Sequence, residues 1–353
     1  MSGAKSGPGI VGADALRGFA ASLFRRAGMP EEHAEIVADA LVWANLRGID
    51  THGVTRIPRY VELMESGEMN VRAKLQVKKE TPAAVLIDCD RAVGPVAMTE
   101  AMAAASRKAH DVGIGLALAR ATTHTAALGY YTLAAAREGM AAVALAASWP
   151  NMAYHGARAA GVSTSPISIA VPGGERAPLL LDMGTGVVSV GKLTQARRAG
   201  ESIPEGWALD RAGNPTIDSQ AAVLPLPMAG PKGSGLALMI ECLTSLVVAN
   251  PLVSEFLEET PLGLRHRQNG LAIAIDIARF GDLGAFRREV DRLVKTVKAL
   301  PRAEGADEIL VPGERGERTL RKRTESGIPI PQAVWKELQA LAERLGVSVP
   351  SAS

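Results

Sequence analysis

The feature that most constrains the fold of this chain is a series of short apolar runs, each of strand length and bounded by glycine or proline. Four of them read GIGLALAR, MAAVALAAS, SPISIAVPG and APLLLDMG, at residues 113–120, 140–148, 165–173 and 177–184. Runs of this length and apolarity are typical of strands buried in a sheet. A helical period at about 126–138 separates the first two, so the sequence predicts an α/β fold in which helices pack on a sheet.

Further segments extend this pattern towards both ends of the chain. Additional strands are expected at LQVKKE, AAVLIDCD and AIAIDIARF, and helices at about 13–27, 30–48, 55–64, 93–113, 283–298 and 331–345. Residues 191–233 show little periodicity and are rich in turn residues. Trp207 and the closely spaced turn signals after it favour an ordered cover over a flexible linker.

The charge balance argues against some classes of partner. The chain has 353 residues, of which 39 are basic and 37 acidic, for a net charge of +2. It therefore gives no electrostatic reason to expect a nucleic acid or a membrane surface as partner. Residues 235–253 approach the length of a membrane span, but Glu241 and Asn250-Pro251 indicate a buried helix instead. The N-terminus lacks the pattern of a secretory signal and the only cysteines are Cys89 and Cys242, so we expect a cytoplasmic protein without disulfides.

A candidate site lies in GIDTHGVTRIPRY, residues 48–60. His52, Arg56 and Tyr60 are spaced four apart, so on a continuous helix they would share one face. An imidazole, a fixed cation and a phenol on one surface predict a site for an anionic substrate. None of the six histidines has the spacing of a metal-ligand motif, so we expect no metal. His33, His110 and His266 lie in charged surroundings and are expected at the surface.

The sequence matches two nucleotide-binding motifs only in part. Gly113 and Gly233 each begin a GxG, but leucine stands where the third glycine of the dinucleotide fingerprint belongs, so a Rossmann fold is not predicted. The segment from Gly186 to Gly191-Lys192 matches a P-loop as far as the lysine, after which Leu193 replaces the residue that would hold Mg²⁺. A P-loop nucleotide hydrolase therefore stays open as an alternative of another class.

Six segments together match one protein family in the right order. They are GIDTHGVTRIPRY (48–60), THTAALGYY (123–131), LDMGTGVVSVGK (181–192), IPEGWALDRAGNPTID (203–218), LPMAGPKGSGLALM (226–239) and LVPGERGE (310–317). The chain resembles the type-2 malate/L-lactate dehydrogenase family, which includes sulfolactate dehydrogenase, ureidoglycolate dehydrogenase, 2,3-diketogulonate reductase and the piperideine/pyrroline-2-carboxylate reductases. The resemblance covers nearly the whole chain.

This resemblance implies a non-Rossmann NAD(P)-binding fold of the sulfolactate dehydrogenase-like type, a mixed sheet with flanking helices. A mainly helical domain built from both chain ends, residues 1–75 with 300–353, would contribute substrate-site residues, and residues 76–299 would bind the cofactor. The resemblance also implies a homodimer, NAD or NADP as cofactor, and hydride transfer between the nicotinamide and a small 2-keto or 2-hydroxy acid. Reduction of a cyclic imino acid is the alternative within the family.

The resemblance also carries over roles for individual residues. His52 and His124 fall on positions given the proton-transfer role, Thr51 is the hydroxyl neighbour of His52, and Asp182 matches an acidic residue grouped with the first histidine. The positions that hold the substrate carboxylate are Arg56 and Tyr60. The positions that contact the cofactor are Ser148, Asp182, Met183, Gly184, Thr185, Lys232, Pro312, Gly313 and Glu314.

Three departures from the family pattern lie in the cofactor loops. The family's GTNP is Ser163-Thr164-Ser165-Pro166 here, its DMATS is Asp182-Met183-Gly184-Thr185-Gly186, and its preceding double glycine is Gly156-Ala157. The second loop loses a serine hydroxyl, so a relative that binds its ligand without turnover stays open as a further alternative. The sequence does not choose between NAD and NADP, between the two histidines as proton donor, or among keto, hydroxy and imino acids.

Overall fold

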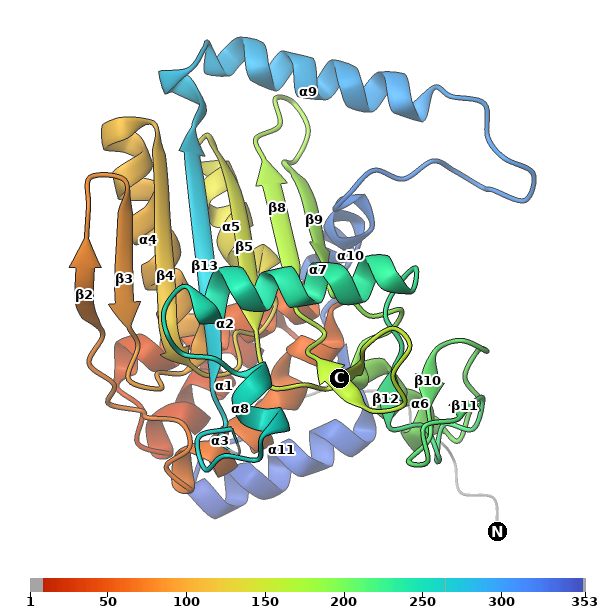
Figure 1. Ribbon diagram of the computed structural model, residues 1–353. Coiled ribbons are helices and arrows are strands. Elements are labelled where there is room, and N and C mark those ends of the chain that lie inside the picture. The colour runs from red at the N-terminus through yellow and green to blue at the C-terminus, as the bar shows by residue number, and fades with distance from the viewer. Residues whose placement is uncertain (1–8, 264, 352–353) are drawn as a thin grey trace.

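The computed structural model describes residues 9–263 and 265–351, and it is built around one seven-stranded sheet (Figure 1). The strand order is β2-β3-β4-β13-β5-β8-β9, in which β3 and β4 run parallel and the other neighbouring pairs run antiparallel. The strands are Gln76–Glu80 (β2), Ala84–Asp88 (β3), Ile114–Thr122 (β4), Met140–Ala147 (β5), Ile167–Val171 (β8), Leu179–Met183 (β9) and Gln268–Asp276 (β13). The prediction of an α/β fold with a mixed sheet is confirmed.

One face of this sheet is built from alanine and lies against α4 (Gly94–Val112) and α5 (Gly129–Arg137). Alternate side chains of a strand point to opposite faces, and the buried members of this face are Ala117, Ala119, Ala142, Ala144, Ala146, Ala272 and Ala274. At Gly115 in the same row, an added Cβ would overlap the carbonyl of Ala105 in α4. Small side chains thus let the helix approach the sheet closely, which is how a chain with only 4% aromatic residues packs its core.

The opposite face carries larger side chains and is crossed by α7 (Pro231–Glu241) and the π-helical turn that continues it (Cys242–Leu246) (Figure 1). The sequence predicted a buried helix here, and this is wrong for its outer side. Met239 is 55% exposed and Val247 is 60% exposed. Glu241, in contrast, is buried, and its Oε1 accepts two backbone N–H groups of the following loop.

Helices from both ends of the chain share a second core, below the sheet in Figure 1. The helices α1 (Ala13–Arg26), α2 (Glu31–Leu46) and α3 (Ile57–Glu65) pack with the closing helix α11 (Gln332–Leu345). A short antiparallel pair, β1 (Gly9–Val11) with β14 (Ile328–Ile330), joins the two ends. This core holds α2 and α3, and with them the connecting residues of the GIDTHGVTRIPRY motif.

Residues 191–233 contain more regular structure than the sequence predicts. They contain all but the first residue of α6 (Val190–Ala199). After this helix comes a small antiparallel sheet of β10 (Ala208–Leu209), β11 (Pro215–Thr216) and β12 (Leu224–Pro225). Only Leu193 of the ten residues in α6 is buried. The helix therefore has no apolar stripe from which its period could have been recognised.

The remaining elements lie towards the C-terminal half. The helix α9 (Leu283–Lys298) has the predicted bounds, whereas α10 (Glu314–Ser326) was not predicted. The latter reads ERGERTLRKRTES and carries no buried side chain, so it too lacks the pattern of a buried face. The shorter elements are α8 (Val253–Leu257), β6 (Met152–Ala153), β7 (Ala160–Val162) and the 3-10 turn Ile277–Arg279. Within residues 9–263 and 265–351, no helix has the length and apolarity needed to cross a membrane.

Candidate active site

The helix expected at about 55–64 is present as α3, but the motif at residues 48–60 is not one continuous helix. It folds into two 3-10 turns, Asp50–His52 and Val54–Arg56, before α3 begins. Gly53 between them is extended, and an added Cβ there would overlap the side-chain amide of Asn45. That amide accepts the N–H of Val54 (2.8 Å) and donates to Asp50 Oδ1 (2.7 Å). A glycine is therefore needed for the close approach, and the turn rather than a helix face positions His52.

His52 and His124 nevertheless lie together, with stacked rings whose centroids are 5.5 Å apart and whose planes are inclined by 20°. The hydroxyl of Tyr60 lies 2.6 Å from Nδ1 of His124. The N–H of Ala126 donates to the same Nδ1 (3.3 Å). Because Nδ1 is thus an acceptor, the neutral ring of His124 carries its proton on Nε2.

The backbone on both sides of His124 is held in an unfavourable conformation. Ala121 and Ala126 have φ angles of 55° and 54°, in the left-handed region that residues with a Cβ rarely adopt. Asn269 on β13 accepts the N–H of Ala121 with its Oδ1 (2.9 Å). Gly94, the first residue of α4, packs so closely that an added Cβ would overlap the carbonyl of His124. Such conformations persist where the surroundings over-determine them, and they cluster at functional sites.

Arg56 is partly buried next to the two rings, and its Nε donates to the carbonyl of Thr51 (2.6 Å). Within the described part of the chain, the Arg56 side chain makes only this hydrogen bond, so its two terminal nitrogens remain for a ligand. The planar fork that they form matches a carboxylate. Thr51 in turn places its Oγ1 3.0 Å from Nδ1 of His52, and Gly191 of α6 packs against its side chain.

Burial and the charge of Arg56 act on both histidines. Burial lowers the pKa of His52 to about 3, and the charge of Arg56 acts in the same direction. Burial also lowers the pKa of His124 well below its usual value, followed by the charges of Arg56, His52 and His266. Both rings are therefore neutral near pH 7. A carboxylate on Arg56 would offset its charge and raise both pKa values, so anion binding favours proton uptake.

Asp182 lies near the end of β9, and its Oδ2 accepts the N–H of Gly129 at the start of α5 (2.9 Å). Burial raises the pKa of Asp182 to about 6, against the opposing effects of this hydrogen bond and of the charge of Arg47. The hydrogen bonds found within residues 9–263 and 265–351 join this carboxylate to Gly129 and to neither histidine. Its predicted role in orienting a histidine stays a prediction.

The loop after β9 contains a polar group that lacks a partner. Thr185 is fully buried, and its Oγ1 has no hydrogen-bond partner among the described residues. Its backbone is fixed, because its N–H donates to Thr164 O (3.0 Å) and its carbonyl accepts the N–H of Met228 (2.9 Å). A buried hydroxyl without a partner costs free energy that a ligand group can remove. Thr185 therefore fits a cofactor contact.

The other predicted cofactor residues lie on several segments around this loop. Met183 is partly buried and Gly184 exposed, directly before Thr185. Lys232 is exposed in the first turn of α7, where Gly233 packs tightly against the carbonyl of Thr185. An exposed ammonium next in sequence to a residue that packs on Thr185 suits the charged groups of a dinucleotide. Ser148, at the end of β5, donates its hydroxyl to the carbonyl of Trp149 (3.3 Å).

The late turn Pro312-Gly313-Glu314 packs on β9 just before Asp182. The carbonyl of Pro312 accepts the N–H of Leu180 (3.2 Å), and Gly313 adopts a φ of 88° against the same residue. Glu314 is engaged within the protein, with both oxygens 2.7 Å from Lys298 Nζ and one 2.6 Å from Arg318. The turn is thus brought near the predicted cofactor loop, while the carboxylate of Glu314 is directed to cations of its own chain.

The segment that resembles a P-loop is organised differently. Ser189 begins α6 and its hydroxyl accepts the N–H of Lys192 (3.2 Å), so a side chain of the protein occupies this helix N-terminus. The side chain of Lys192 is exposed. Among the residues that the structure describes, no group of three or more histidine, cysteine or acidic side chains is arranged to hold a metal ion.

Sequence reasoning placed His266 at the surface, and this is wrong. The ring packs edge-on against Trp149, with centroids 5.0 Å apart and an interplanar angle of 76°. Both ring nitrogens are buried without a hydrogen-bond partner in the described part of the chain. The flanking Arg265 and Arg267 suggested a solvated segment, and no local pattern in the sequence distinguishes His266 from a surface histidine.

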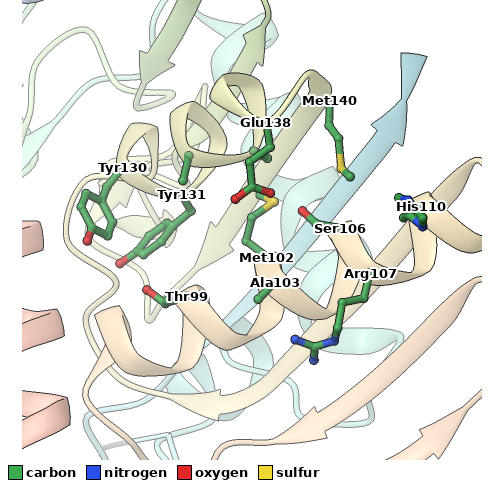
Figure 2. A pocket seen from close by; sticks show the side chains of 12 residues that line it. Thr99, Met102, Ala103, Ser106, Arg107, His110, Tyr130, Tyr131, Glu138 and Met140 are labelled. Atoms are coloured by element: carbon green, nitrogen blue, oxygen red, sulfur yellow. The ribbon is translucent and has the colours of Figure 1, made fainter. Parts of the chain in front are cut away.

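A cavity of about 470 Å³ opens elsewhere, between α4 and α5. Figure 2 shows Tyr130 and Tyr131 of α5 beside Thr99, with Arg107 and His110 further along α4. None of the predicted catalytic residues lines this cavity. Both tyrosines line the cavity with part of their side chains and use their hydroxyls elsewhere, because Tyr130 donates to Asp39 (2.7 Å) and Tyr131 to the carbonyl of Thr125 (2.7 Å).

The chain is similar to several known proteins in sequence and in structure. The family model of malate/L-lactate dehydrogenase matches residues 11–339. The malate dehydrogenase of Pyrococcus horikoshii is 37% identical over 349 residues, 95% of each chain, and its solved structure has a TM-score of 0.88 over 99% of each chain at 33% identity. The L-sulfolactate dehydrogenase of Methanocaldococcus jannaschii is 36% identical over 329 residues, 93% of this chain and 94% of its own. The structure of delta1-piperideine-2-carboxylate reductase from Pseudomonas syringae pvar. tomato has a TM-score of 0.83 at 28% identity and covers 94% of this chain and 99% of its own.

Proposed function

The chain belongs to the malate/L-lactate dehydrogenase family, and from that premise we propose that His52, His124, Tyr60 and Arg56 form its active site. The protein is an oxidoreductase that acts on a hydroxyl group next to a carboxylate. The observation that carries the proposal is the guanidinium of Arg56, whose terminal nitrogens have no hydrogen-bond partner among the described residues, beside two stacked imidazoles. Together they offer a carboxylate anchor and proton-transfer groups at one place.

In the proposed reaction the substrate carboxylate binds the terminal nitrogens of Arg56. The Nε2–H of His124 donates to the substrate oxygen, because Nδ1 of the same ring is held by Tyr60 and Ala126. The bound carboxylate raises the pKa of the histidines. A histidine can then give a proton to the oxygen in reduction and take it back in oxidation. Thr51 fixes the ring of His52 through its hydroxyl.

NAD or NADP, when bound, supplies or accepts the hydride. The residue that fits its polar groups most directly is Thr185, whose buried hydroxyl lacks a partner within the described residues. Lys232 and Ser148 lie on neighbouring segments, and the turn at Pro312–Glu314 packs on the strand that leads into this loop. Asp182, three residues before Thr185, keeps a proton to a higher pH than an ordinary carboxyl, because burial raises its pKa to about 6.

The test is the oxidation of NADH and NADPH, measured separately by loss of absorbance, with pyruvate, oxaloacetate, 2-ketoglutarate, a diketogulonate and piperideine-2-carboxylate. We expect turnover with at least one 2-keto acid and loss of that turnover in His124→Ala. Lys192→Ala, outside the proposed site, should keep it. A protein that binds these compounds without oxidising either cofactor would instead be a non-catalytic relative, and phosphate release that depends on Lys192 would indicate a nucleotide hydrolase.

The same site could serve a cyclic imino acid, the second candidate, which the structural likeness to a piperideine-2-carboxylate reductase supports. A ring nitrogen would then take the place of the keto oxygen opposite His124, with the carboxylate still on Arg56. The two candidates separate in the same assay. Turnover of piperideine-2-carboxylate with NADPH and silence with every keto acid would favour the imino acid.

We propose further that the protein is a cytoplasmic homodimer. Its two cysteines, Cys89 and Cys242, are both unpaired, which suits a reducing compartment. The outer side of α7 and its π-helical continuation exposes an apolar row of Leu238, Met239, Leu243, Leu246 and Val247. Contiguous exposed apolar surface of this kind is typical of subunit contacts. Leu243→Glu should yield monomers in analytical ultracentrifugation, whereas Phe280→Glu, an exposed apolar residue elsewhere, should leave dimers.

A further inference from the structure

His266 lies where three segments of the proposed active site meet. Its ring packs edge-on against Trp149, the neighbour of the cofactor-site residue Ser148. When protonated, His266 lowers the pKa of His124, after the larger effects of burial, Arg56 and His52, and the charge of Arg59, the residue before Tyr60, lowers the pKa of His266 after the larger effect of burial. The contacts with Trp149 and with Glu68, which follows α3, place His266 between segments that carry residues of the proposed site.

The ring of His266 is fixed in place, but its two nitrogens have no hydrogen-bond partner among the described residues. The backbone N–H of His266 donates to Glu68 Oε2 (3.2 Å), and Trp149 covers one side of the ring. Both ring nitrogens are shielded from solvent and have no hydrogen-bond partner within residues 9–263 and 265–351. An imidazole always has at least one polar N–H, and buried polar groups are nearly always paired. Two buried nitrogens without a partner in the described part of the chain fit the polar group of a ligand.

We propose that His266 is a specificity-determining residue that binds the second polar group of the substrate, the one at the far end from the carboxylate on Arg56. This inference rests on the proposed function. It assigns to the protein 2-keto or 2-hydroxy acids with a hydrogen-bonding group on their far carbon, such as a second carboxylate, in preference to acids that end in a methyl group.

The chemistry of the ring suits this role. Burial, with the charge of Arg59, lowers the pKa of His266 to about 4, so the ring is neutral at physiological pH and offers one donor and one acceptor. A substrate with a polar far end satisfies the donor. A substrate ending in a methyl group leaves it unpaired, and sites built to pair a polar group reject the analogue that lacks it.

The experiment compares oxaloacetate with pyruvate, two 2-keto acids that differ in the second carboxylate, in the wild-type protein and in His266→Phe. Phenylalanine keeps an aromatic ring against Trp149 and removes both nitrogens. We expect the KM for oxaloacetate to rise at least tenfold with kcat changed less than threefold, and kcat/KM for pyruvate to change less than threefold. His266→Gln, which retains a donor and an acceptor, should recover most of the selectivity.

Two controls separate this role from a structural one. His110→Phe makes the same replacement at a histidine whose side chain is 74% exposed, and it should change neither substrate. Thermal unfolding and the fluorescence of bound NADH or NADPH should show that His266→Phe is folded and binds cofactor as the wild type does.

The outcomes also separate this inference from the proposed function. Equal changes with both substrates, no change in selectivity, or a wild-type protein that reduces only compounds without a second polar group would each overturn the role of His266 and leave the reductase function standing. A wild-type protein that oxidises neither cofactor with any compound of the panel would overturn the proposed function itself.

Discussion

Arg56 places a guanidinium fork beside two imidazoles while using only its Nε within the described part of the chain. Replacing it with alanine would remove the two charge-assisted hydrogen bonds that we propose it makes to the substrate carboxylate. We expect Arg56→Ala to raise KM on the order of a hundredfold, or about 2.7 kcal/mol, with a smaller change in kcat. Steady-state kinetics on the best keto acid measures both. Arg25→Ala on the surface of α1 is the control, and a loss confined to kcat would contradict the assignment.

His124 is expected to act on the chemical step rather than on binding. Its Nε2 carries the proton of the neutral ring, and general acid–base catalysis is typically worth about a hundred- to ten-thousandfold. His124→Ala should therefore lower kcat by at least about a hundredfold. Tyr60→Phe, which removes only the hydroxyl 2.6 Å from Nδ1, should lower kcat by a smaller factor. If both variants kept the wild-type kcat under single-turnover conditions, the proton would travel by another route.

The sequence predicted part of this site from spacing alone and part only by resemblance. The spacing of His52, Arg56 and Tyr60 correctly brought three side chains to one region, although Gly53 breaks the helix on which that expectation rested. No local pattern could bring in His124, because its position depends on how β4 ends and on contacts to Asn269 and Gly94. His266 was misplaced for the same reason.

At the scale of elements, the packing of α4 controls the geometry around His124. Gly94 begins α4 directly against the carbonyl of His124, and an added Cβ would overlap that backbone. We expect Gly94→Ala to destabilise the protein by about 1–3 kcal/mol, as overpacking does, and to lower kcat more than tenfold by shifting His124. Urea unfolding and kinetics measure the two effects.

A matched glycine provides the control for this substitution. An added Cβ at Gly18 in α1 would meet no atom within 4 Å, so Gly18→Ala should stabilise the helix by about 0.5–1 kcal/mol. The opposite signs make the pair informative. Equal effects of the two substitutions would mean that the tight packing at Gly94 has no consequence for the site.

Elements with an apolar pattern were predicted well and elements without one were missed. The alternating alanine and leucine of β4 and the stripe of α9 predicted their elements within a residue or two. The polar helix α10 and the mostly exposed α6 carry no such pattern, and their stability comes from contacts distant in sequence. Arg47, for example, donates to the carbonyl of Gly313 (3.0 Å) and pairs with Glu317 (3.1 Å).

At the scale of the whole molecule, these long-range contacts tie the two chain ends to the site. Arg47 follows α2 and its side chain binds the turn before α10, which packs on β9 beside Asp182. Arg323 of α10 pairs with Asp50 (2.7 Å), which lies in the proposed substrate-site motif at residues 48–60. The side chain of Arg47 is buried against Trp43. Arg47→Ala should therefore both lower stability by about 2–3 kcal/mol and weaken NADH or NADPH binding. Glu62→Ala, in an exposed ion pair with Arg59, should do neither.

The pH dependence of the free energy of unfolding is a sum of contributions from individual side chains, and these contributions differ in sign. Burial lowers the pKa of His52 to about 3 and that of His266 to about 4. It also lowers the pKa of His124 well below its usual value. Below about pH 6.5 the unfolded chain binds protons at these histidines and the folded chain does not. Their contribution to the free energy of unfolding is therefore complete above that pH and is lost as pH falls. For Asp182 the folded pKa of about 6 exceeds the unfolded value near 3.9. Its contribution is complete at low pH and is lost as pH rises towards 6.

Two substitutions should therefore change the slope of stability against pH in opposite directions. Between pH 5 and 6, His52→Gln removes a group that makes stability rise with pH, so the slope should fall by up to about 1.4 kcal/mol per pH unit. Asp182→Asn removes a group that makes stability fall with pH, so the slope should become steeper. Free energies of unfolding in urea at pH 5, 6 and 7 test both, with His110→Gln as the exposed control. Curves parallel to the wild type would mean that neither side chain changes its environment on folding, and an opposite order would place the charges of the site differently from this structure.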